Sequence, residues 1–346
     1  MTRLPAPRGA ISERLFEALA ESPGRIEQPE TQGLDGLADE DLQLALYCCY
    51  ELHYRGFDGV DPDWEWEPAL LAFRGELESC FESGLRELVE RTEETVEPDR
   101  MDLALREIAD SDQGPSLSQH VEREADIDQV REFMIHRSAY QLKEADPHTW
   151  AIPRMHGPPK AAMVEVQADE YGGGRAERIH AHLFAEAMEA VGLDPTYGAY
   201  LDRIPAVTLA TVNQMSLCGL HRRLLGAIVG HLALFEMTSS VPNRRYAEGL
   251  RRLGYGGAAT EFFDEHVLAD SVHENIAAVD LAGGLARQEP ELSADVLWGA
   301  RVLVALDGRW ATHLLDSWEA GHSSLLEPSG QQLGDAAAAV GGRGAV

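Results

Sequence analysis

Basic residues are scarce in this sequence. Its 346 residues include 29 Lys and Arg against 59 Asp and Glu, which gives a formal charge of −30. Lysine occurs only at Lys143 and Lys160. A chain this acidic is repelled by the phosphates of nucleic acids and by anionic membrane surfaces. The sequence therefore predicts no nucleic-acid or membrane partner and favours a protein that acts on a small molecule.

Cysteines and long apolar runs are also scarce. Cys48, Cys49, Cys80 and Cys218 form no CxxC pair and no regular spacing, which is typical of buried thiols in a reducing compartment. No segment approaches the roughly 20 apolar residues of a membrane span, and the N-terminus lacks the apolar core of a signal peptide. These absences predict a soluble, cytoplasmic protein.

Apolar residues recur at helical spacing along most of the chain, whereas the alternating pattern of strands is nearly absent. The sequence predicts an all-α fold, with helices over 39–56, 66–93, 100–110, 126–145, 158–171, 175–192, 205–238, 241–253, 257–280 and 290–319. Because "SDQGPSLSQH" interrupts the pattern, we expect an N-terminal helical extension over residues 1–125 and a main domain over 126–326. The small, Gly-rich residues of 327–346 predict a disordered tail.

The stretch "EFFDEHVLADSVHENI" (261–276) places His266, Asp270 and His273 at spacings of four and three. On a helix, these side chains fall within about 60° of one another. Phe262 and Ile276 lie on the same face, so it is expected to be buried. One interpretation is a structural cluster of hydrogen-bonded polar side chains. The other is an iron or manganese site, because imidazole and carboxylate suit those ions and no thiolate competes.

Further candidate ligands lie on other predicted helices. Glu236 falls on the apolar stripe of "LLGAIVGHLALFEMTSS", where an unpaired carboxylate would be costly. In "DEYGGGRAERIHAHLFAEAM", His180 shares a stripe with apolar residues, while Glu170 precedes it by ten residues across the glycines. Glu177, three residues before His180, is an alternative to Glu170. Glu144 in "QLKEADPHTW" lies near a helix end, where a solvated surface acid is an equal interpretation. Three histidines and at least three carboxylates suffice to hold two irons about 3.5–4 Å apart.

These residues resemble the haem-oxygenase-like diiron oxidases and oxygenases, also described as iron-containing redox enzymes. The resemblance rests on "DEYGGG" followed by a His, on the isolated Glu236, and on the His266-x3-Asp270-x2-His273 signature, and it covers roughly residues 126–326. It implies a helical bundle shaped like haem oxygenase but without haem. It also implies two iron ions, with manganese as a substitute, held by Glu144, Glu170, His180, Glu236, His266, Asp270 and His273.

The resemblance further implies a function. Members of that family activate O2 to oxidise a small amine, amino acid or carboxylate, by N-oxygenation or oxidative C–C cleavage, often in secondary metabolism. O2 would be the co-substrate, and an external electron donor is compatible. Residues 1–125 lie outside the resemblance, and their helices are expected to mediate homodimerisation or to cover the site. Four arginines near the site helices would either pair with a substrate carboxylate or neutralise acidic residues: Arg137, Arg154, Arg222 and Arg223.

Two other classes of protein remain compatible with the sequence. A ferritin-like bundle normally uses two Glu-x2-His pairs, of which only Glu177-x2-His180 is present here. A non-enzymatic helical interaction protein, in which the polar cluster only fixes helix register, would have the same fold but would bind no iron. Haem oxygenase activity itself is disfavoured, because several converging carboxylates are hostile to haem, and close helix packing explains Gly226 and Gly230.

Overall fold

The computed structural model describes residues 2–92 and 96–327, with the backbone alone described for residues 269–272. In this part of the chain, helices are the only regular elements apart from one isolated bridge between Thr2 and Phe57. The predicted all-α fold is confirmed. The predicted tail at 327–346 lies, except for Glu327, outside the described residues.

The first third of the chain contains α1 (Ala10–Leu19), α2 (Glu40–Glu51), α3 (Pro68–Leu88), α4 (Met101–Asp110) and α5 (Leu117–Arg123). The remainder contains α6 (Ile127–Gln141), α7 (Asp146–Thr149), α8 (Gly157–Glu170), α9 (His180–Ala190), α10 (Ala206–Leu220), α11 (Leu225–Arg252), α12 (Ala258–Asn275), α13 (Gly283–Gln288) and α14 (Ser293–Glu319). A π-helical segment, Ile276–Ala282, joins α12 to α13.

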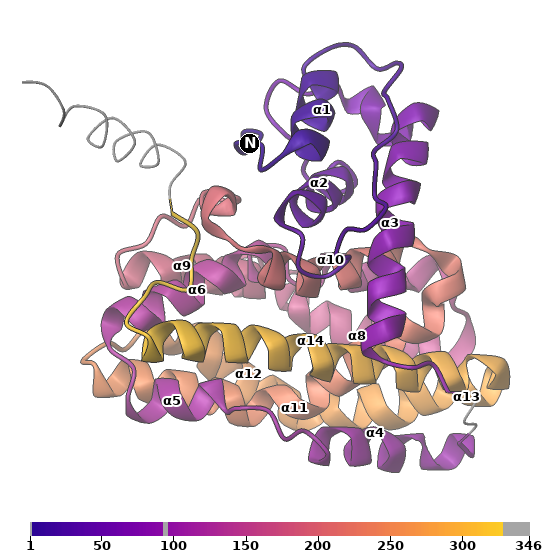
Figure 1. Cartoon of the computed structure of the whole chain (residues 1–346). Helices are drawn as coiled ribbons and strands as arrows, with labels where there is room; N and C mark the ends of the chain where they lie inside the picture. The colour runs from indigo at the N-terminus through magenta and orange to yellow at the C-terminus, as the bar shows by residue number, and fades with distance from the viewer. Residues whose placement is uncertain (1, 93–95, 328–346) are drawn as a thin grey trace, which may run out of the picture.

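Helix α11 is at the centre of the bundle. It packs along α12 and α14, and it also contacts α5, α10 and α4 (Figure 1). Within the described part of the chain, the helix Arg222–Arg252 is the one with the length and apolar composition of a membrane span, and 67% of its apolar window is buried. Its apolar character is therefore explained by its position in the core.

Glycines bring the backbones of α11 and α14 close together. A Cβ added to Gly230 would lie 1.8 Å from the Val296 carbonyl oxygen, and one added to Gly299 would lie 2.1 Å from the Ala227 carbonyl oxygen. Neither backbone atom can move aside without disturbing its helix.

We therefore expect Gly230→Ala to lower the free energy of unfolding by about 2–3 kcal/mol, through overpacking between the two helices. Gly75→Ala is the matched control, because Gly75 lies inside α3 with nothing within 4 Å of the added Cβ. This control should gain about 0.5–1 kcal/mol from helix propensity. Urea unfolding of both variants measures the difference, and equal stabilities would contradict the proposed close contact.

Two predicted helix boundaries are wrong. The helix expected over 205–238 is divided between α10 and α11, and α11 continues through Pro242 instead of ending before it. Arg154 donates hydrogen bonds to the carbonyls of Gly219 and Leu220, so it satisfies the end of α10 from a distant segment. Beyond Pro242, the continued burial of Tyr246 against neighbouring helices outweighs the roughly 3 kcal/mol cost of an internal proline.

The N-terminal helices cover the bundle on two sides. Helix α2 packs on α10 and is flanked by α1 and α3, while α4 and α5 run along α11 and α14 (Figure 1). Helix α1, which the sequence did not predict, is capped by Asp41 of α2, whose carboxylate accepts from the backbone N–H groups of Ile11 and Ser12 at 2.7 and 2.8 Å. One hydrophobic core includes Phe73 and Trp298, from both sides of the boundary near residue 125, which stays a prediction.

Candidate metal centre

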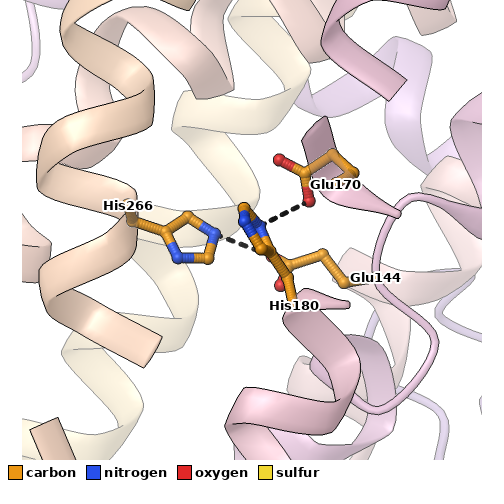
Figure 2. A group of neighbouring side chains, drawn as sticks. All are labelled: Glu144, Glu170, His180 and His266. Atoms are coloured by element: carbon orange, nitrogen blue, oxygen red, sulfur yellow. Dashed lines mark ion pairs between the residues drawn. The ribbon is translucent and has the colours of Figure 1, made fainter. Parts of the chain in front are cut away.

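Two overlapping groups of buried histidines and carboxylates lie inside the bundle. The first contains Glu144, Glu170, His180 and His266 (Figure 2), and the second contains Glu170, Glu236 and His273. In each group, one potential ligand atom per residue lies within 4.8 Å of the others. Glu170 belongs to both groups. Six of the seven predicted ligands are therefore brought together by the fold.

A glycine-rich loop brings Glu170 and His180 into contact. Glu170 ends α8 and His180 begins α9, and Nδ1 of His180 lies 3.0 Å from Oε2 of Glu170. The intervening glycines, Gly172–Gly174, all have positive φ angles, and a Cβ on Gly172 would meet the backbone of Arg178 at 2.6 Å. Only glycine permits this reversal without strain, because other residues rarely adopt these angles. The "GGG" segment therefore places a carboxylate and an imidazole side by side.

Glu144 is buried, so its interpretation as a solvated surface acid is wrong. Its side chain lies beyond the end of α6, and one oxygen is 3.7 Å from Nε2 of His266. The next residue, Ala145, is the only non-glycine residue with a positive φ angle in the described part of the chain, at 72°. This sharp turn, which costs a non-glycine residue about 1 kcal/mol or more, accompanies the inward direction of the carboxylate.

The second group joins α8, α11 and α12. Nδ1 of His273 lies 3.5 Å from Oε2 of Glu236, and its Nε2 lies 2.8 Å from Oδ2 of Asp169. Glu236 is buried on α11, as its place on the apolar stripe predicted. Asp169 was not predicted, although it directly precedes Glu170 in "DEYGGG".

Each histidine of α12 is oriented through one ring nitrogen. Nδ1 of His266 lies 2.8 Å from the carbonyl oxygen of Phe262, a distance at which the N–H donates to that oxygen. This places the lone pair of the neutral His266 ring on Nε2, which faces Glu144. In His273 the arrangement is reversed, since Nε2 contacts Asp169 and Nδ1 faces Glu236. Such contacts on the second nitrogen are typical of histidines that bind metals.

The matches with known proteins agree with this geometry. A family model described as an iron-containing redox enzyme matches residues 131–308, just over half of the chain. The chain belongs to the iron-containing redox enzyme family. No curated protein matches the sequence. The predicted haem-oxygenase-like bundle is confirmed, and residues 1–130 lie outside the family match.

The donor atoms of this iron-containing redox enzyme fit a metal ion. Oε2 of Glu144 is buried and makes no hydrogen bond within the described residues, while Nδ1 of His180 and of His273 is buried and faces the carboxylates of Glu170 and Glu236. Buried polar atoms of this kind are costly unless a ligand satisfies them. Imidazole and carboxylate without thiolate are a suitable donor set for iron. The cluster can therefore hold iron, as the family description requires.

The remaining candidate residues belong to neither donor group, or their side chains are not among the described residues. The side chain of Asp270 is outside the described residues, although its backbone lies in α12 between His266 and His273. Glu177 is exposed and belongs to neither group, which disfavours it as the alternative to Glu170. Cys218, which the sequence predicted as an ordinary buried thiol, is buried, and burial raises its pKa to about 12.

Three of the four candidate substrate arginines have structural or surface positions. Arg154 binds the end of α10, Arg222 is exposed, and Arg223 forms a two-pronged pair with Glu82 at 2.5 and 2.9 Å. Arg137 differs, because it lines a pocket that shares Phe235 and Ser239 with the small cavity bordering the metal centre.

A second pair of buried histidines adjoins the centre and was missed from the sequence. Nε2 of His148 lies 3.1 Å from Nδ1 of His231, and His148 lines the small cavity that also borders Glu170. Burial lowers the pKa of His148 to about 4, so both rings are neutral at physiological pH. His231 precedes Glu236 by five residues on the same apolar helix, which is the one signal that the sequence offered.

The charges of the metal-free cluster predict an opposite pH dependence for stability and for iron binding. Burial alone lowers the pKa of His273, but contacts with Glu236 and Asp169 outweigh it and raise the pKa to about 9. Because an unfolded histidine has a pKa of about 6.5, the stabilisation by protonated His273 is fully present below that pH and is lost as the pH rises through about 9. Iron requires the neutral ring, so its affinity rises over the same range.

We expect the metal-free protein to melt at a lower temperature at pH 8.5 than at pH 6.5, while ferrous iron binds more tightly at the higher pH. Thermal melts and anaerobic iron titrations at both pH values measure the two trends. His182→Gln is the control and should show the same two trends as the wild type, because His182 lies on the exposed side of α9. Trends of the same sign, or no trend in either measurement, would contradict the raised pKa of His273 and its role as an iron ligand.

Proposed function

We propose that this iron-containing redox enzyme is a non-haem diiron oxidase or oxygenase. The observation that carries the proposal is the sharing of Glu170 by two donor groups. A single ion would need one such group, whereas two groups with a common carboxylate are the arrangement that holds a metal pair.

The residues divide between the two ions in a simple way. Glu144, His180 and His266 would hold one iron, Glu236 and His273 would hold the other, and Glu170 would lie between them. Asp270 completes the set on the basis of its sequence position. When bound, two ferrous ions supply the electrons with which O2 is activated. Manganese has the same preference for oxygen and nitrogen ligands and is the expected substitute.

The chain itself orients the ligands and shields them from water. The contacts of His266 with Phe262 and of His273 with Asp169 fix both rings before metal binds. All six described ligands are buried, with exposed fractions of 6% or less. Burial on this scale limits access of water to the ions and favours oxidation of a bound substrate over release of partly reduced oxygen.

The proposal extends to the surroundings of the reaction. The substrate would be a small amine, amino acid or carboxylate, oxidised by N-oxygenation or oxidative C–C cleavage, as the resemblance implies. An external donor would return the irons to the ferrous state, and a cytoplasmic location would supply it. The strongly acidic surface supports a small-molecule substrate over a nucleic acid.

The direct test is an anaerobic titration of metal-free protein with ferrous iron, followed by addition of O2. We expect about two irons per chain, and O2 uptake with a change in visible absorption that metal-free protein does not show. One iron per chain would overturn the paired site. No stoichiometric iron in folded, helical protein would favour the structural polar cluster of an interaction protein. Slow oxidation with growth of an iron store would favour a ferritin-like function.

A further inference from the structure

A pocket of about 410 Å³ lies beside the metal centre, between α6, α11 and α14. The segment that links α4 to α5 closes one side of it, through residues such as Asp112 and Ser116. This segment lies outside the family match at 131–308, so part of the pocket wall is particular to this chain. The volume is within the range of pockets that hold small molecules.

The pocket and the metal centre have a common wall. Phe235 and Ser239 of α11 line both this pocket and the small cavity that borders Glu144, Glu170, Glu236 and His266. Glu236 lies between these two residues in sequence. Phe235 and Ser239 therefore form the wall between a molecule in the pocket and the cavity that borders the predicted ligands.

Charges of both signs line the pocket. Arg137 of α6 and Asp307 of α14 face each other, with a guanidinium nitrogen 3.9 Å from a carboxylate oxygen. At this distance the two charges attract each other, but the nitrogen and oxygen are too far apart for a direct hydrogen bond. Arg245 and Asp112 also line the pocket, so its formal charge is zero. The guanidinium of Arg137 lies over the ring of Trp310, 4.1 Å from its centre, which holds it in place.

Two buried polar atoms of the lining have no hydrogen-bond partner in the described part of the chain. They are Oε1 of Gln141, an acceptor, and Nε1 of Trp310, a donor. Because such atoms are costly to bury, a ligand that donates to one and accepts from the other would stabilise the pocket. Aromatic side chains form one part of the wall, with Phe133, Tyr246 and Phe263 beside Trp310, while small polar residues such as Ser118, Thr238 and Asn243 line another part.

We propose that this pocket binds the substrate and that the substrate is a zwitterionic α-amino acid with an apolar or aromatic side chain. Its carboxylate pairs with Arg137 and accepts from Nε1 of Trp310. Its ammonium pairs with Asp307 and donates to Oε1 of Gln141. The assignment of this molecule as substrate rests on the proposed function, whereas its binding does not.

The charges distinguish this class from the other two that the family resemblance implies. A carboxylate without an ammonium would be repelled by Asp307, and an amine without a carboxylate would be repelled by Arg137. A zwitterion satisfies both at once. The aromatic part of the wall favours an apolar side chain, since a charged one would lose its hydration there.

The experiment is anaerobic calorimetry on both metal-free and ferrous-loaded protein. The probes are L-leucine, L-phenylalanine and L-tryptophan, together with the matched amines and the matched acids that lack the ammonium group. We expect at least one amino acid to bind at least tenfold more tightly than its own amine and its own acid. This comparison needs only the wild-type chain, so it does not depend on the folding of a variant.

Variants assign each charge to its residue. Arg137→Gln is expected to abolish the preference for the amino acid over its amine, which lacks the carboxylate. Asp307→Asn is expected to abolish the preference for the amino acid over its acid, which lacks the ammonium. Arg309→Gln and Asp316→Asn are the matched controls, because both residues are exposed on α14 and neither lines the pocket. The controls should bind as the wild type does.

The outcomes separate this inference from the proposed function. Three outcomes would overturn the zwitterion assignment, even if two irons bind. They are failure of every amino acid to bind, binding of the amines or acids as tight as that of the amino acids, and unchanged preferences in both variants. Selective binding without any bound iron would leave the pocket as assigned and would overturn the diiron function.

Discussion

Glu170→Gln is expected to remove both metal ions, because Glu170 belongs to both donor groups. Glutamine keeps the volume of the side chain but replaces an anionic ligand with a neutral amide. His180 would also lose the carboxylate 3.0 Å from its Nδ1. Iron per chain should fall from about two to below 0.2 after desalting, and O2 uptake should fall at least 100-fold, since ligand removal costs far more than the 10–100-fold of a supporting contact. Iron analysis and an oxygen electrode measure these losses.

Glu177→Gln provides the matched control. Glu177 lies seven residues later in the same segment, is exposed and belongs to neither donor group. We expect wild-type iron content from this variant. His273→Ala, which alters only the second group, should remove that iron while the protein remains helical by circular dichroism. Full iron content in Glu170→Gln would show that the ligand assignment is wrong, and loss of iron in Glu177→Gln would restore Glu177 as the ligand.

Glu51→Gln is expected to lower the free energy of unfolding by about 3–5 kcal/mol, because it leaves a buried ammonium without its counter-charge. Nζ of Lys143 lies 2.9 Å from Oε2 of Glu51, and their side chains are 0% and 1% exposed. The centres of the rings of Tyr47 and Tyr54 lie 4.4 and 4.3 Å from the ammonium, so aromatic side chains enclose it. Urea unfolding measures the change.

A double variant and a surface control test this explanation. Glu51→Gln combined with Lys143→Met should recover most of the loss, because no buried charge then remains. Glu248→Gln, which breaks the exposed pair with Arg251, should cost less than about 1 kcal/mol. If Glu51→Gln is as stable as the wild type, the buried pair does not stabilise the fold.

This ion pair also connects the N-terminal helices to the metal centre. Glu51 ends α2, outside the family match, whereas Lys143 directly precedes the predicted ligand Glu144. A change at Glu51 is therefore expected to weaken iron binding as well as stability. The link between α4 and α5 closes one side of the proposed substrate pocket, so residues before 126 contribute to the surroundings of the site at two places.

Local patterns in the sequence were sufficient for the class of fold and for half of the site. Helical periodicity of apolar residues is a local property, and it predicted the all-α bundle. His266 and His273 were found because their spacing places both on one helix face. Glu236 was found because a carboxylate on an apolar stripe needs a partner.

Contacts between distant segments decided what the sequence could not. The end of α10 depends on Arg154, and the start of α1 depends on Asp41, each from another helix. Glu144 follows the end of α6, where no helical periodicity indicates the direction of its side chain. Its burial, next to the turn at Ala145, is seen only in the folded structure.

The sequence by itself therefore determined the helical class and the candidate ligand types, since both follow from the kinds of residues and from spacings within one or two turns of helix. The family was indicated by the resemblance of motifs spread over residues 126–326. The tertiary structure alone decided that Glu170 is common to both donor groups, that Lys143 and Glu51 pair, and that Arg137 faces Asp307. These are contacts between residues that are distant in the sequence. They depend on how the helices pack, which no spacing along one helix specifies.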